Sequence, residues 1–347
     1  MTTRDLLRGL LAGACLVTRA VVVSAQSAPV PSPSALMPAL TAALSTYDVV
    51  LKPDTEAAEW WAGAPSVVRD QHGIVWMAAR MRSPEAPRGQ RGYEIRLLRS
   101  DDGVRFETVH RIRRADVPVA GFERPALLID PVTRRFKLYL CGAWQGGPWA
   151  ILKLDDAESP TGFRASTARP VITAPPQRSA RDVGVHEYKD PVVVHDGRQW
   201  HAYVTGYARQ NERTYHYTSD DGERWRPVGD VNAPILDLTG WRNFFVRPAS
   251  VLPIGAGYLF VYEGSSTRWH DPVYNVVTGL AYTFDLHHLI DLTPEAPLAV
   301  STTPGQFHTF RYSHWLRVGD EVWIYAEVAR PDDAHEIRRF RLALPPG

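Results

Sequence analysis

The chain has 347 residues, of which 44% are hydrophobic and 22% are charged, so it is long enough for one large, soluble all-β domain. Its formal net charge of +1 argues against a nucleic-acid partner held by phosphate neutralisation. The 11 Trp and 14 Tyr suit β-strands and also suit the faces of sugars, so their number alone does not decide the function.

Residues 1–25 have the pattern of a signal peptide. Two arginines precede an apolar run over residues 10–17, and small residues before Gln26 offer a cleavage site. We therefore expect the mature protein to be secreted or periplasmic. No later stretch is apolar enough to span a membrane. Residues 26–58, which begin with a stretch rich in proline and serine, are interpreted as a linker and N-terminal extension.

Five similar segments follow one another over residues 59–347. Each opens with a short apolar strand, and the opening positions are Pro65, Pro125, Pro191, Pro248 and, more loosely, Tyr312. The steps between these positions are 60, 66, 57 and 64 residues. Second strands are expected at 74–80, 136–142, 200–206, 258–264 and 322–328, each followed by a third. A repeat of this length with three or four strands per unit predicts an all-β, five-bladed β-propeller.

Two further segments, residues 100–106 and 219–225, share the pattern Ser-Asp-Asp-Gly-x-x-aromatic. Both follow a third strand. Asp-Gly favours a tight turn beneath which the aromatic side chain can pack. We interpret both segments as structural turns that mark the blade repeat.

Blade geometry brings two sets of residues to one mouth of the axial channel. The first strand of a blade lines the axis, and the second runs antiparallel to it. The first set is Ala64, Arg124, Asp190, Arg247 and Arg311, preceded by Gly63, Glu123, Lys189, Val246 and Phe310; the second is Arg80, Cys141, Thr205, Glu263 and Glu327. Buried charge is costly unless it is paired or faces a ligand. These residues therefore indicate a ligand pocket, or alternatively a salt-bridge network that closes the channel.

The blade openings and the turns resemble those of the five-bladed propeller glycosidases of families 43, 32 and 130. Three segments carry the resemblance most clearly: Tyr188-Lys189-Asp190-Pro191-Val192, Phe122-Glu123-Arg124-Pro125, and Tyr262-Glu263-Gly264 with Thr278-Gly279-Leu280-Ala281. The resemblance covers residues 60–342 and implies an exported glycoside hydrolase-like enzyme with a carbohydrate substrate. It departs from family 43 at Ala64, where that family usually has the aspartate that acts as general base, so the three-carboxylate set is incomplete.

Cleaving a glycosidic bond requires an acid on one side of the sugar and a base or nucleophile on the other. No cation adjoins Glu263 in the sequence, so we expect Glu263 to be the acid. Asp190, beside Lys189, is expected to be the better anion and to act as base or orienting group. Glu123 would bind sugar hydroxyls or tune a neighbouring group.

The arginines of the expected mouth suggest an anionic ligand. Arginine binds carboxylate and phosphate groups through paired hydrogen bonds. Arg124, Arg247 and Arg311 could therefore hold a uronic or sialic acid, or inorganic phosphate as in the family 130 phosphorylases. The structural alternative is that each arginine pairs with a glutamate of the same mouth.

Other residues are expected to contribute to substrate binding. These are Lys189, Arg80, His314 and Trp61, the last as a stacking platform at the rim unless it packs against blade five; Glu187 and Tyr274 are expected to reach or shape the pocket. Cys141, the one cysteine that remains if residues 1–25 are removed, is expected in the core. No metal site or cofactor is predicted, although calcium occurs in related propellers. Three functions stay open: a hydrolase, a phosphorylase, and a non-catalytic carbohydrate-binding propeller.

Overall fold

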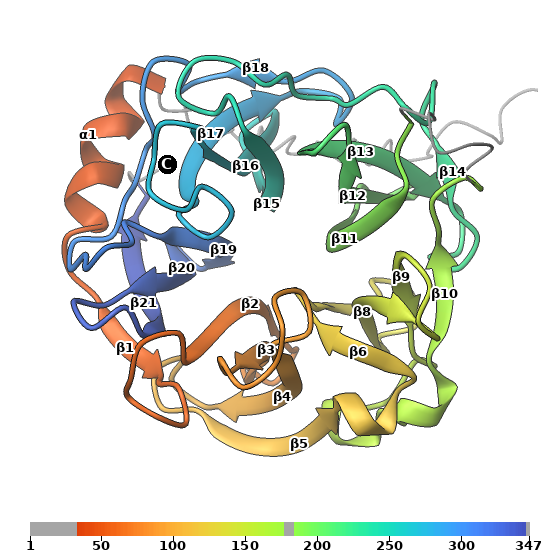
Figure 1. Cartoon of the computed structure of the whole chain (residues 1–347). Coiled ribbons are helices and arrows are strands. Elements are labelled where there is room, and N and C mark those ends of the chain that lie inside the picture. The colour runs from red at the N-terminus through yellow and green to blue at the C-terminus, as the bar shows by residue number, and fades with distance from the viewer. Residues whose placement is uncertain (1–32, 177–183, 345–347) are drawn as a thin grey trace, which may run out of the picture.

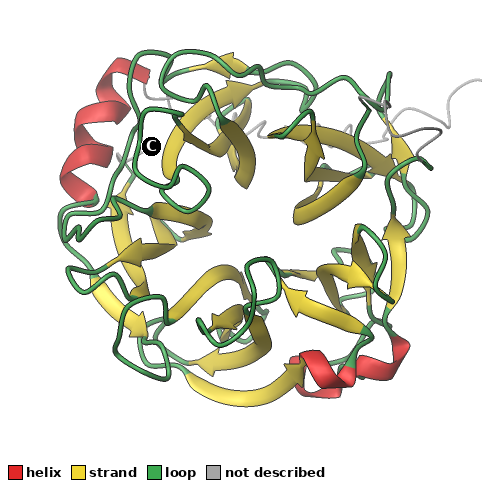
Figure 2. Ribbon diagram, in the orientation of Figure 1, coloured by secondary structure: helices red, strands yellow, loops and turns green. Residues whose placement is uncertain are grey.

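The structure, a computed structural model, describes residues 33–176 and 184–344. Within these residues the strands form five antiparallel blades around a central axis (Figure 1). Helices are few and short, and they lie outside the ring of strands (Figure 2). The predicted all-β, five-bladed propeller is therefore confirmed. The expected signal peptide lies outside the described residues.

Each blade is a meander whose first strand lines the axis. Blade one is β2 (Trp61–Arg69), β3 (Val75–Arg82), β4 (Gly92–Ser100) and β5 (Glu107–Arg113). Blade two is β6 (Val119–Phe122) and β7 (Ala126–Ile129), which share one position, then β8 (Phe136–Trp144), β9 (Trp149–Lys153) and β10 (Arg169–Ile172). Blade three is β11 (Glu187–His195), β12 (Trp200–Ala208), β13 (Asn211–Ser219) and β14 (Arg226–Pro227). All the expected second strands are present, each within two residues of its predicted ends.

Blade four is β15 (Phe245–Ile254), β16 (Gly257–Ser265), β17 (Val277–Thr283) and β18 (Ile290–Asp291). Blade five is β19 (Phe310–Val318), β20 (Glu321–Ala329), β21 (His335–Ala343) and, from the other end of the chain, β1 (Asp48–Leu51). The helices are α1 (Pro33–Ala43) and the short 3-10 turns η1 (Arg114–Asp116), η2 (Pro160–Gly162) and η3 (Ala165–Thr167). No helix among the described residues is long and apolar enough to cross a membrane.

The N-terminal segment is part of the propeller, which corrects the predicted boundary at residue 59. Strand β1 pairs antiparallel with β21 and so forms the outer edge of blade five. Leu40, within α1, and Leu44, just beyond its end, pack into the core beside Phe340 and Leu342. The two ends of the chain thus close the ring together. Sequence analysis missed this because β1 is short and lies outside the repeat.

The structural turns connect neighbouring blades. In the turn after β4, the Gly103 carbonyl accepts a hydrogen bond from the Tyr325 hydroxyl at 2.9 Å. The turn after β13 repeats this bond between Gly222 and Tyr139, at 2.6 Å. A third turn, after β17, receives the Tyr203 hydroxyl at the Leu286 carbonyl, also at 2.6 Å. The turns therefore hold adjacent blades in register around the axis.

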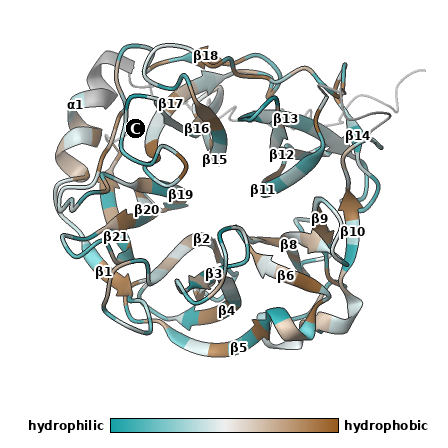
Figure 3. Ribbon diagram, in the orientation of Figure 1, coloured by the Kyte–Doolittle hydropathy of each residue, from teal (hydrophilic) through white to brown (hydrophobic). Residues whose placement is uncertain are grey.

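Polar and apolar residues divide the inner strands along the axis. Strand β11 runs from Glu187 and Lys189 through the valines at 192–194 to His195, and Figure 3 shows hydrophilic and hydrophobic stretches on the strands of the ring. Apolar side chains between the blades form the core. The axial channel consequently has one charged end and one apolar end.

Candidate functional site

The inner strands present equivalent residues to the axis at three successive levels. At the first level, inner-strand residues lie opposite residues near the ends of the second strands, and the pairs are Gly63 with Arg80, Glu123 with Cys141, Lys189 with Thr205, Arg247 with Glu263, and Arg311 with Glu327. The second level, where regular pairing breaks, is Ala64, Arg124, Asp190, Pro248 and Tyr312. The third level is Ser66, Ala126, Val192, Ser250 and His314.

This register corrects the sequence alignment of blades four and five by one residue. Arg247 and Arg311 are equivalent to Lys189 and not to Asp190. An alignment on the opening prolines misplaces them because Pro248 lies one residue earlier in its blade than Pro191 does. The correction matters because one residue along the strand moves a side chain to another level of the channel.

The charged end of the channel contains a pocket of about 240 Å³. Its lining is Arg82, Arg88, Gly89, Glu123, Trp149, Glu187, Lys189, Arg247, Val273, Tyr274, Arg311 and Tyr312. We refer to this cavity as the mouth pocket. Of the residues that the sequence assigned to substrate, four lie on it: Glu123, Lys189, Arg247 and Arg311. Their contact with substrate stays a prediction.

A dense set of ion pairs surrounds the mouth pocket. Glu327 is fully buried and accepts hydrogen bonds from Arg311 at 2.7 and 3.0 Å, from Arg80 at 3.0 Å and from His335 at 2.7 Å. Glu212, at the start of β13, binds Lys189 at 2.5 Å and also pairs with Arg247. The structural alternative weighed for the arginines thus holds for Arg247 and Arg311, although the partner of Arg247 is Glu212, which the sequence did not indicate.

Two carboxyl groups line the mouth pocket, and their pKa values differ. Burial pushes the pKa of Glu123 up, but the nearby cations, first Arg80 and Arg82, outweigh it and hold this pKa at about 2. Burial raises the pKa of Glu187, and Lys189 compensates only in part. Glu123 is thus a stable anion, and Glu187 is the better proton carrier of the two.

Glu263 and Asp190 lie on the axis but are fully enclosed, and neither lines the mouth pocket. Burial raises the pKa of Glu263 to about 7 against the opposing effect of Arg247, Arg124 and Arg311. Burial raises the pKa of Asp190 as well. Lys189 is the first of the cations that oppose this rise, although burial outweighs it and its ammonium group binds Glu212. That Asp190 is the better anion of the two stays a prediction.

Tyr312 stands between the mouth pocket and these enclosed carboxyl groups. It has a φ of 51°, which is unusual for a residue with a side chain, and its own amide donates to Glu263 Oε1 at 2.9 Å. Its ring lies 5.3 Å from the Arg80 guanidinium and 5.1 Å from that of Arg311. Tyr312 therefore forms the floor of the mouth pocket.

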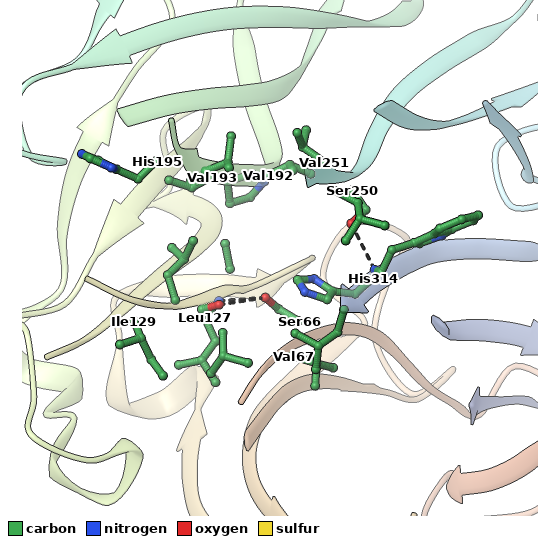
Figure 4. A pocket seen from close by; sticks show the side chains of 18 of the residues that line it. Ser66, Val67, Leu127, Ile129, Val192, Val193, His195, Ser250, Val251 and His314 are labelled. Atoms are coloured by element: carbon green, nitrogen blue, oxygen red, sulfur yellow. Dashed lines mark hydrogen bonds between the residues drawn. The ribbon is translucent and has the colours of Figure 1, made fainter. Parts of the chain in front are cut away.

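His314 belongs to the opposite end of the channel, which corrects its assignment to the substrate site. It lines a separate, largely apolar pocket of about 410 Å³ with Val67, Leu127 and Val192 (Figure 4). Arg124 borders this apolar pocket too and does not line the mouth pocket. The alternation along the inner strands explains the error, because both residues stand beyond the first level.

Trp61 is not a stacking platform at the rim. Its ring is fully buried, lies parallel to the His335 ring at 4.1 Å, and donates from Nε1 to the Asp333 carbonyl at 3.1 Å. The alternative, packing against blade five, is the one the structure supports. The ring also lies 4.3 Å from the Arg82 guanidinium and 4.9 Å from that of Arg311, so side chains of the protein occupy the space that a stacked sugar would need.

Two important residues of the site were missed in the sequence. Arg82 follows Arg80 by two residues on β3, and the alternation of a strand places both on one face, so this signal was available. Glu212 gave no signal, because its position depends on the single parallel bridge to Phe245 that joins blades three and four. Among the described residues, no group of three or more His, Cys, Asp or Glu side chains is arranged to hold a metal ion.

Comparison with solved structures connects this fold to enzymes of carbohydrate chemistry. The chain is similar to a glycoside hydrolase with a TM-score of 0.64 and 15% identity, over 87% of this chain and 92% of the other. It is similar to BT0996, solved in an RGII complex, with a TM-score of 0.63 and 14% identity, over 88% and 95%. A β-1,2-mannobiose phosphorylase from Listeria innocua, in complex with β-1,2-mannobiose, gives 0.61 and 13%, over 85% and 94%.

These similarities confirm the type of fold that the sequence suggested, a five-bladed propeller like those of the family 43, 62 and 130 glycoside hydrolases and phosphorylases. The sequence itself matches no family model and no curated protein. At this level of identity the comparison defines the fold and leaves the substrate to the chemistry of the site.

Proposed function

We propose that the protein is an exported enzyme that cleaves a glycosidic bond in an anionic glycan at the mouth pocket. The observation that carries this proposal is the pairing of Glu123 and Glu187, two carboxyl groups of opposite proton affinity, on one charged pocket. Glycoside cleavage needs one carboxyl group that holds a proton and one that does not.

In this proposal Glu187 protonates the leaving oxygen, and Glu123 supplies the negative charge that the developing cation of the sugar ring requires. Glu187 lies at the start of β11 and Glu123 just after β6, so neighbouring blades carry the two groups to one pocket. Glu263, the acid expected from the sequence, would have to reach substrate past Tyr312. Asp190 and Glu263 instead lie enclosed behind Tyr312, where their charge influences the electrostatic potential in the mouth pocket.

The proposal is tested by measuring turnover of two kinds of substrate. Glu187→Gln should lose about 10²–10⁴-fold on a glycan with a poor leaving group, and much less on an activated aryl glycoside that needs no proton. Glu263→Gln should keep most of its activity on both. The opposite ranking of the two variants would return the acid role to Glu263.

Two alternatives have specific support. The arginine-rich pocket would also accept inorganic phosphate, so product release that depends on added phosphate would favour a phosphorylase. The enclosure of Asp190 and Glu263, together with Ala64 in blade one, favours a carbohydrate-binding propeller. Sugar binding without any turnover, in wild-type protein shown to be folded, would select that function.

Export is part of the proposal and rests on the pattern of residues 1–25. N-terminal sequencing of protein secreted by a bacterial host should give a start near Gln26. An intact Met1 or Thr2 terminus on protein retained in the cytoplasm would contradict it.

A further inference from the structure

Arg82 is a buried cation that has no direct ion pair with any carboxylate of the described residues. It is 2% exposed, it lines the mouth pocket, and it forms no ion pair among the residues that the structure describes. Its guanidinium lies 4.3 Å from the Trp61 ring and 4.4 Å from the Tyr274 ring. One nitrogen donates to the Tyr274 hydroxyl at 2.5 Å, and Nε has no partner.

The other cations of the mouth are neutralised. Arg80, two residues earlier on the same strand, pairs with both Glu123 and Glu327. Arg88, at the outer edge of the pocket, binds Asp271 at 2.6 Å. Burial lowers the pKa of Arg82, and the nearby Glu123 offsets this only in part, whereas the pKa of Arg80 is raised. Such an unpaired buried charge is expensive for the free protein.

The net charge of the mouth pocket and its ion-pair partners is also positive. Its cations are Arg80, Arg82, Arg88, Lys189, Arg247 and Arg311, and the acids that line the pocket or pair with these cations are Glu123, Glu187, Glu212, Asp271 and Glu327. Six against five leaves one positive charge when Glu187 is ionised, and six against four leaves two when Glu187 holds the proton that the proposed function requires. The level behind Tyr312 adds Arg124 against Asp190 and Glu263, and it adds no net charge when Glu263 holds its proton.

We propose that Arg82 binds the carboxylate of a uronic-acid-type sugar and thereby selects acidic glycans. The two aromatic rings meet edge to face, with centroids 5.1 Å apart, so both pack toward one side of the guanidinium and leave its other side for a ligand. A guanidinium edge of two N–H groups matches a planar carboxylate. The excess positive charge of the mouth accommodates the single negative charge of a carboxylate in either protonation state of Glu187.

This inference rests on the proposed function for its choice of a sugar ligand, but binding tests it separately from turnover. The probes are galacturonide and glucuronide disaccharides, the methyl ester of each, and inorganic phosphate. A methyl ester keeps the sugar and removes only the charge. Affinities are measured by calorimetry for wild type, Arg82→Met, Arg82→Lys, and Arg224→Met as a control at an exposed turn far from the axis.

Wild type should bind at least one acid about tenfold to a hundredfold more tightly than its methyl ester, the range for a hydrogen bond to a charged group. Arg82→Met should bring this ratio close to one, Arg82→Lys should restore it in part, and Arg224→Met should leave it unchanged. Melting curves of each variant show that it is folded.

Equal affinity for acid and ester, no binding of any acid in the panel, or an acid preference that survives Arg82→Met would overturn the inference. Phosphate binding that requires Arg82 while the acids do not bind would also overturn it, in favour of a phosphate site. Arg82-dependent acid binding without turnover would leave the inference standing and reject the proposed function. Turnover of an acidic glycan that is unchanged by Arg82→Met, with no Arg82-dependent preference for acid over ester, would do the reverse.

Discussion

Arg80 and Arg82 form a matched pair in which the same substitution should have different effects on stability. Both arginines lie on β3, both are buried, and they are separated by one residue. Arg80 bridges Glu123 and Glu327, whereas Arg82 contacts only uncharged aromatic groups. Methionine keeps most of the volume of each side chain and removes the charge.

The magnitudes follow from what each substitution leaves behind. Arg80→Met leaves the 13%-exposed Glu123 and the fully buried Glu327 without one of their partners, and removing one partner of a buried pair costs about 3–5 kcal/mol. Arg82→Met gives up cation–π contacts of about 2 kcal/mol, but it removes an unpaired charge whose burial costs several kcal/mol. We therefore expect Arg82→Met to be as stable as wild type or more stable, and Arg80→Met to be at least about 3 kcal/mol less stable.

Guanidinium-induced unfolding, followed by tryptophan fluorescence, measures both free energies of unfolding. The slope of the transition should be equal in the two variants, so that the midpoints compare directly. If Arg82→Met destabilises the protein as much as Arg80→Met does, Arg82 has a counter-charge, and the reasoning that makes it an anion receptor fails.

Three further outcomes test other parts of the structure. The pKa of Glu263 is raised to about 7 in the folded protein, so protonated Glu263 stabilises the fold fully below the unfolded pKa near 4.5, and this stabilisation is lost as the pH rises through 7. The free energy of unfolding should therefore fall between pH 5 and 8. Urea unfolding across this range should show a smaller fall for Glu263→Gln. Tyr203→Phe removes the hydrogen bond to the Leu286 carbonyl and should lower the free energy of unfolding by about 1–3 kcal/mol, because a buried acceptor loses its partner. An unchanged unfolding midpoint would show that this turn does not help to join the blades. Deleting the residues up to and including β1 should lower the melting temperature markedly and raise aggregation, because it exposes the β21 edge, and a truncated protein that melts like the full chain would contradict ring closure by both termini.

The sequence was sufficient for the fold because the repeat carries it. Opening prolines, apolar second strands and Ser-Asp-Asp-Gly turns recur at the blade period, and each marks a local structure that does not depend on distant contacts. The same signals could not reveal strand β1. It is short, and it completes a blade formed by the opposite end of the chain, so no local sequence pattern marks it. Blade five lacks its opening proline, and blade four has it one residue early, so the sequence alignment of both blades was wrong by one residue.

The site was only partly predictable, for two physical reasons. Sequence order shows which residues reach the axis. The level of a side chain along the axis, however, depends on where strand pairing breaks, and this break places His314 and Arg124 toward the apolar end. Proton affinity depends on burial, which adjacent residues do not reveal: Lys189 follows Tyr188 and precedes Asp190, yet its ammonium group binds Glu212 on another strand. Arg82 is significant because of a missing partner, and a missing partner is visible only in three dimensions.

The most direct test of the account is a crystal structure of the inactive Glu187→Gln variant soaked with an acidic oligosaccharide that wild-type protein cleaves or binds. The account predicts a sugar in the mouth pocket, its scissile oxygen beside residue 187, Glu123 across the ring, and its carboxylate against the edge of Arg82. A sugar seated at the apolar end beside His314, or one in the mouth whose carboxylate points away from Arg82, would contradict it.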